Sequence, residues 1–131
     1  MPHHISTEQS GLGVVISFSG VVSGAEVLAL NARLISEELF SQCRYQVWDF
    51  SAATRLDITP EDLRSVSMQD TTASEENPDL KVAIVGQPAF FDGKDRLLQI
   101  YEEVWSTYKP KVFLDVESAR QWASSHDKEQ A

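Results

Sequence analysis

Cysteine, long apolar runs and basic residues are all scarce in this sequence. Cys43 is the only cysteine among the 131 residues, so no disulfide can form within the chain. A membrane-spanning helix needs about 20 consecutive apolar residues, and no segment reaches that length. The opening residues, MPHHISTEQS, lack the basic flank and the apolar stretch of a secretion signal. These absences predict a cytoplasmic protein with no membrane span.

The shortage of basic residues narrows the range of partners. The 20 acidic residues outnumber the 11 basic ones and give a formal net charge of −9. A surface with this charge repels phosphate backbones and anionic headgroups, so we expect no binding to nucleic acid. Six acidic residues and one basic residue lie between positions 59 and 79. We interpret this stretch as a solvated face, with binding to a basic partner or a ligand as the alternative.

Strand-like and helix-like segments alternate along the chain, whose length suits one domain, here 1–131 with a core at about 11–123. The expected strands are 12–19, 45–50, 80–85 and 111–114, with a further strand near 3–6. The expected helices are 25–40, one starting at 59 that fades through 71–79, one carrying 97–108, and one following 115. Residues 20–24 are expected to end the first long strand and to connect it to the first helix. This order predicts an α/β domain with a mixed, mostly parallel sheet of four or five strands and alternating helices.

The strand predicted at 45–50 has two distinct faces, because successive side chains of a strand point to opposite sides of a sheet. One side carries Tyr45, Val47 and Asp49, and the other carries Gln46, Trp48 and Phe50. The apolar residues on both sides predict a buried strand.

The helix predicted to start at Thr59 has a well-defined first turn. Pro60 follows at a position where its missing N–H is not needed. Asp62 lies three residues after Thr59, which is the spacing of a capping box. We therefore expect Thr59 to be the N-cap. Further caps are expected at Ser23 or Gly24 and at Asp115.

Three phrases of the sequence, VWDFSAATRLDITPEDLR, LKVAIVGQ and KVFLDVESARQWA, resemble the STAS domains. These are small α/β modules typified by the sporulation anti-sigma-factor antagonist, and the match is nearest to the bacterial proteins described as SpoIIAA-like. The resemblance covers about residues 11–123. It implies a SpoIIAA-like fold and a non-enzymatic regulatory or binding role, with recognition of a protein partner.

The resemblance also implies a candidate switch or binding site at Asp49, Ser51, Asp57 and Thr59. In the antagonists, Asp-Leu-Ser is followed by Asp-Ser-Ser-Gly, whose second serine is phosphorylated. Asp49-Phe50-Ser51 matches the first phrase, and Asp57-Ile58-Thr59-Pro60 stands in place of the second, which puts Thr59 at the phospho-acceptor position. The chain departs from the pattern because threonine replaces serine and proline replaces glycine, which removes a backbone donor. We favour Thr59 as a helix cap over Thr59 as a switch.

No set of residues in the sequence forms a recognised catalytic or metal-binding pattern. Asp49 and Asp57 could together bind a cation or act as acid and base, but no third oxygen ligand follows at a known spacing. Turn capping is the preferred role for both aspartates. Cys43 has no histidine near it in sequence and is interpreted as a plain, partly buried thiol. We expect no cofactor, no metal and no enzymatic activity.

The loop over 86–93 follows a predicted central strand, which is where α/β domains place ligand loops. Phe90, Phe91 and Lys94 are its candidate recognition residues, although two aromatic side chains in a loop also commonly fill a core. The fold group is similar in architecture to the CRAL-TRIO lipid carriers. That similarity implies an alternative function, a carrier whose crevice holds a small apolar ligand between Phe90, Phe91 and Trp105. A homodimer through apolar helix faces is compatible with either function.

Overall fold

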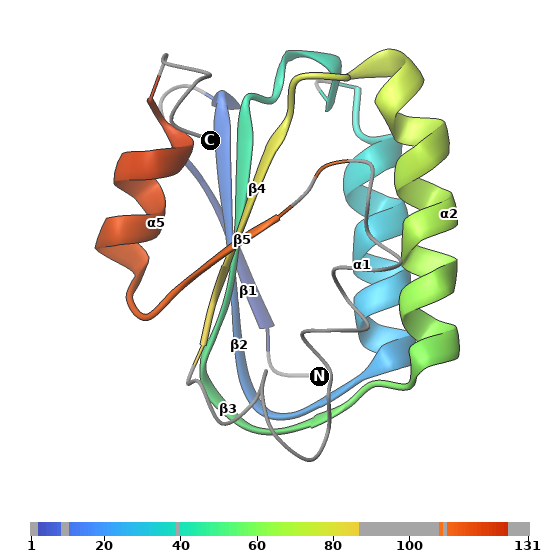
Figure 1. Ribbon diagram of the computed structural model, residues 1–131, viewed down its shortest axis with the longest axis vertical. Coiled ribbons are helices and arrows are strands. Elements are labelled where there is room, and N and C mark those ends of the chain that lie inside the picture. Colours follow the sequence, from blue (N-terminus) through green and yellow to red (C-terminus); the bar gives the residue numbers. More distant parts are fainter. Residues whose placement is uncertain (1–2, 9–10, 39, 87–107, 109, 126–131) are drawn as a thin grey trace.

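The structure, a computed structural model, describes residues 3–8, 11–38, 40–86, 108 and 110–125. Figure 1 shows a twisted sheet at the centre, with helices α1 and α2 on one face and α5 on the other. The five strands lie in sequence order, β1-β2-β3-β4-β5. β1 is antiparallel to β2, and all other neighbouring strands are parallel. The predicted α/β class and mostly parallel sheet are confirmed.

The elements have the following bounds. The strands are β1 His3–Glu8, β2 Gly13–Ser23, β3 Tyr45–Asp57, β4 Lys81–Val85 and β5 Lys111–Phe113. The helices are α1 Gly24–Ser36, α2 Pro60–Glu76 and α5 Val116–Ala123, with a short 3-10 helix at Phe40–Gln42. None of the described helices is both long enough and apolar enough to span a membrane.

The predicted two-sided character of residues 45–50 is confirmed. Trp48 and Phe50 lie in the core between the sheet and α1 and α2, where Phe18 stacks on Phe50 with ring centroids 4.7 Å apart. Tyr45 and Val47 lie on the other face, in the core beneath α5. Residues 82–85 of β4 are apolar and buried, because both faces of this strand are covered.

Two predicted strand ends are wrong. β2 does not break at Gly20 but continues to Ser23, and β3 does not end at Phe50 but continues to Asp57. The two extensions pair with each other in parallel through two register shifts, one of them next to Gly20, whose φ is 71°. Glycine therefore accommodates a β-bulge here and does not end the strand.

The extensions form a two-stranded arm that we call the β2–β3 arm, comprising residues 19–23 and 52–57. The described pairing of β1 with β2 stops at Phe18, and that of β4 with β3 stops at Asp49. Within the described residues, the arm therefore has no strand on either side. In Figure 1 it curves towards the side of the sheet that carries the first turns of α1 and α2.

The end of α1 differs from its prediction, and the end of α2 agrees with it. α1 ends at Ser36 and not at residue 40, because Phe40 reaches the core from the following 3-10 turn. α2 ends at Glu76, within the stretch 71–79 over which the sequence predicted its end. Ala73 is buried in its last turns, and the Asn77 side chain donates 2.8 Å hydrogen bonds to the carbonyls of Phe40 and Cys43. The helix predicted at 97–108 lies outside the described residues except for Tyr108.

Candidate functional site

The first turns of α1 and α2 lie in contact at the carboxyl ends of β2 and β3. Ser23 and Asp57 are partners in the parallel register, so both helices start from the same edge of the sheet. Ser23 caps α1 by accepting a hydrogen bond from the backbone N–H of Glu26 at 3.1 Å. A Cβ atom at Gly24 would overlap the carboxylate of Asp62, so glycine is what allows the two helix starts to meet.

Thr59 is the N-cap of α2, as the sequence predicted. Its Oγ1 accepts from the N–H of Asp62 at 3.0 Å, and the Asp62 carboxylate accepts from the N–H of Thr59 at 3.0 Å. Pro60 occupies the first turn and leaves no free N–H at its position. The carboxylate of Asp62 thus holds the place at the positive end of the helix where an external anion would otherwise bind.

Asp49 and Ser51 are brought together, but Asp57 is not. Oδ1 of Asp49 accepts a 2.9 Å hydrogen bond from the N–H of Ser51, next to the register shift in β3. Asp57 lies eight residues further along the same strand, and at about 3.3 Å per residue it is far beyond the reach of Asp49. The alternative of a two-carboxylate cation or acid–base site therefore has no geometric basis. Among the described residues, no three His, Cys, Asp or Glu side chains are grouped as a metal site would require.

Cys43 is buried, and its thiol donates to the carbonyl of Tyr45 at 3.3 Å. Burial raises the pKa of the thiol, which keeps it protonated and weakens it as a nucleophile. The candidate ligand-loop residues Phe90, Phe91 and Lys94, together with Trp105, lie outside the described residues. Their roles remain predictions.

The end of the arm and the start of α2 form one exposed surface. Val21 is 44% exposed and is the register partner of Arg55. Arg55 approaches Asp57 to 3.9 Å, and both side chains are about two-thirds exposed, so this pair adds little stability. We call this region the carboxyl-edge surface and define it by Val21, Arg55, Asp57, Thr59 and Glu61. It combines one apolar side chain with an excess of negative charge.

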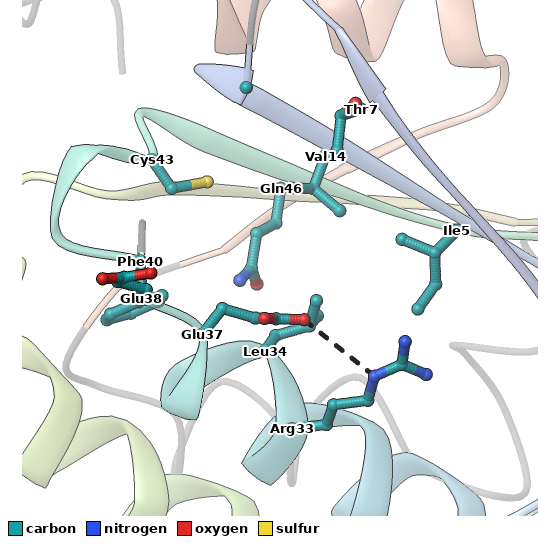
Figure 2. A pocket seen from close by; sticks show the side chains of 11 residues that line it. Ile5, Thr7, Val14, Arg33, Leu34, Glu37, Glu38, Phe40, Cys43 and Gln46 are labelled. Atoms are coloured by element: carbon teal, nitrogen blue, oxygen red, sulfur yellow. Dashed lines mark ion pairs between the residues drawn. The ribbon is translucent and has the colours of Figure 1, made fainter.

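A pocket that the sequence analysis did not predict lies at the opposite edge of the sheet. It has a volume of about 370 Å³ and is enclosed by the first halves of β2 and β3, by β1 and by the end of α1 (Figure 2). Its apolar walls include Ile5, Val14, Leu34 and Phe40. The sequence held one signal for it, since Gln46 is a polar residue on the same buried strand face as Trp48 and Phe50.

At the level of sequence, neither a scan against protein-family models nor a search of curated proteins gives a match. Solved structures do match. The anti-sigma factor antagonist SpoIIAA in its unphosphorylated form aligns with a TM-score of 0.61 at 10% identity, over 96% of this chain and 100% of that one. A DUF3478 protein with a SpoIIAA-like fold, from Shewanella loihica PV-4, aligns with a TM-score of 0.55 at 17% identity, over 93% of this chain and 92% of its own. The resemblance to the STAS domains is thereby confirmed as a SpoIIAA-like fold.

Proposed function

We propose that the chain is a non-enzymatic recognition module that binds a protein partner through the carboxyl-edge surface. The observation that carries the proposal is the β2–β3 arm, which extends past its described neighbours β1 and β4 and exposes Val21 next to two helix starts. Val21 is an exposed apolar side chain among polar residues, and an apolar centre with a polar rim is the general layout of a protein interface. The similarity in fold to a protein described as an anti-sigma factor antagonist supports this class of function.

The charge of the surface indicates the kind of partner. Within the carboxyl-edge surface, Asp57 and Glu61 stand against one basic residue, Arg55, which already faces Asp57. Complementary charge speeds association and excludes partners of the same sign. The partner surface is therefore basic around an apolar contact for Val21.

Recognition by this surface does not depend on phosphorylation of Thr59. The Thr59 hydroxyl is already engaged as a cap, and the Asp62 carboxylate occupies the helix N-terminus. A phosphate on Thr59 would disrupt this cap and meet the negative charges of Asp57, Glu61 and Asp62. Thr59 is thus a structural residue of the recognition surface, and the phospho-acceptor role implied by the resemblance is the alternative.

Photocrosslinking tests the location of the partner surface. A benzoylphenylalanine residue is placed at Val21 and, as a control, at Gln121, which is exposed on α5 at the other face of the sheet. We expect one protein to be captured in cell extract from Val21 and not from Gln121. The captured protein is then purified and titrated against Val21→Arg and Gln121→Arg, which make the same charge change. Val21→Arg is expected to weaken binding at least tenfold, and equal affinities would refute the assignment.

A further inference from the structure

The pocket between β1, β2, β3 and α1 lies at the edge of the sheet opposite to the carboxyl-edge surface, so what it binds is independent of the proposed protein recognition. Its volume of about 370 Å³ falls within the range of small-molecule sites. Ile5 and Val14 wall it from the sheet, and Leu34 and Phe40 wall it from the end of α1 and the 3-10 turn. The walls therefore favour an apolar molecule.

One polar group is aimed into this apolar space. Gln46 is only 3% exposed, and its side chain extends from β3 towards α1 inside the pocket (Figure 2). Its Oε1 accepts a 3.0 Å hydrogen bond from Nε1 of Trp48. Indole N–H is a donor only, so this bond fixes which end of the amide is the oxygen.

With Oε1 engaged by Trp48, Nε2 is the donor end of the Gln46 amide. Within the part of the chain that the structure describes, Nε2 of Gln46 donates no hydrogen bond. Gln46 lines the pocket, so a molecule that displaces water from it must supply an acceptor for this N–H or leave the donor unpaired. A carbonyl oxygen is such an acceptor.

The charges at the mouth of the pocket limit the ligand further. Arg33 approaches Glu37 to 4.0 Å, and Glu38 adds a second acid, so acids outnumber the base. This excess disfavours a carboxylate or a phosphate on the ligand. We propose that the pocket binds an uncharged, largely apolar small molecule whose carbonyl oxygen accepts a hydrogen bond from Nε2 of Gln46.

The test uses the full chain and two probes with the same number of carbons, 2-decanone and decanoate. Both carry a carbonyl-type acceptor on an apolar chain, but only decanoate is charged. Binding is followed by NMR through the side-chain amide resonances of Gln46, which report directly on a new hydrogen bond. We expect 2-decanone to shift these resonances saturably, and decanoate to bind at least tenfold more weakly.

Two sets of variants separate the hydrogen bond from the apolar walls and the mouth. Gln46→Met keeps the length of the side chain without its donor, and is expected to bind 2-decanone about tenfold more weakly. This variant also removes the acceptor of Trp48, so Val14→Phe provides a second test that fills the pocket and leaves Gln46 in place. It is expected to abolish binding. Glu38→Gln should strengthen the binding of decanoate, whereas Glu75→Gln, the same change on α2, should not.

Each contrary result overturns a defined part of the proposal. Tighter binding of decanoate than of 2-decanone would make the site one for anionic lipids. Unchanged ketone affinity in a folded Gln46→Met variant would remove the role of the amide. Absence of any shift with 2-decanone, or unchanged binding in Val14→Phe, would show that this pocket is not the ligand site. None of these results bears on the partner surface around Val21.

Discussion

The ring of Tyr45 lies directly over Gly13 on the neighbouring strand β2, in the space that a side chain would otherwise fill. Crossing Gly13 lets the Tyr45 hydroxyl reach β1, where it donates to Glu8 at 2.7 Å. The same carboxylate accepts from Arg120 of α5, with N···O distances of 2.9 Å. Gly13 thus allows one side chain to connect three strands beneath α5.

Gly13→Ala is expected to destabilise the fold through this contact. The added Cβ would overlap the Tyr45 ring, so the ring must move and its bond to Glu8 is lost. Overpacking of this kind typically costs about 1–3 kcal/mol of unfolding free energy, measurable by urea denaturation. In a Tyr45→Leu background the same substitution should cost clearly less. Equal costs in both backgrounds would show that the ring is not the obstacle.

Thr59→Ala is expected to lower the unfolding free energy by about 1 kcal/mol while the fold stays intact, because it removes the acceptor for the Asp62 N–H. Thermal unfolding measures the change. Thr72→Ala is the matched control, since Thr72 is exposed within the same helix and its hydroxyl makes only a 3.5 Å contact to the Met68 carbonyl. Its stability should stay the same or rise slightly, because alanine favours helix. A melting curve for Thr59→Ala that matches the parent would contradict the capping role.

Phosphorylation of Thr59 should weaken the start of α2 and not create a binding surface there. A chain phosphorylated at Thr59 by chemical ligation, compared with the unmodified chain by hydrogen exchange, is expected to lose amide protection in the first turn of α2. The physical cause is the loss of the cap together with repulsion from Asp57, Glu61 and Asp62. Tighter binding of the captured partner to the phosphorylated chain would establish the switch instead.

Sequence patterning predicted those parts of the fold that depend on local signals. Alternation over 45–50 separated the Tyr45 face from the Trp48 face, and the spacing of Thr59, Pro60 and Asp62 predicted the first turn of α2. These features follow from neighbouring residues alone.

The parts that the sequence did not reveal depend on contacts between distant segments. The sequence predicted a turn after residue 50, yet residues 52–57 form a strand by pairing with the end of β2. Few of these residues are buried, so burial of apolar side chains gave little signal for a strand there. Asp49 looks like a strand end because aspartate is uncommon in strands, but its carboxylate binds the N–H of Ser51 beside a bulge. The pocket lies between β1, the starts of β2 and β3, and the end of α1, which are distant in sequence, and Gln46 was its one signal in the sequence.

A last prediction concerns the buried carboxyl group between α1 and α2. Asn31 donates to Asp70 at 3.1 Å and to Gln69 at 2.8 Å, and Asp70 is buried. Burial raises the pKa of Asp70 from 3.8 to about 7, although the hydrogen bond from Asn31 opposes this shift. The folded chain therefore keeps a proton that the unfolded chain releases above pH 4.

The unfolding free energy should consequently fall as the pH rises from about 4 to about 7 and level off above that. The full effect is on the order of a few kcal/mol, at about 1.4 kcal/mol for each unit of pKa shift. Urea denaturation at a series of pH values measures it. Asp70→Asn, which keeps the size of the side chain but does not titrate, should remove most of this decline, while Glu75→Gln on the exposed side of α2 should leave it unchanged. A decline of the same size in Asp70→Asn would assign the pH dependence to other groups.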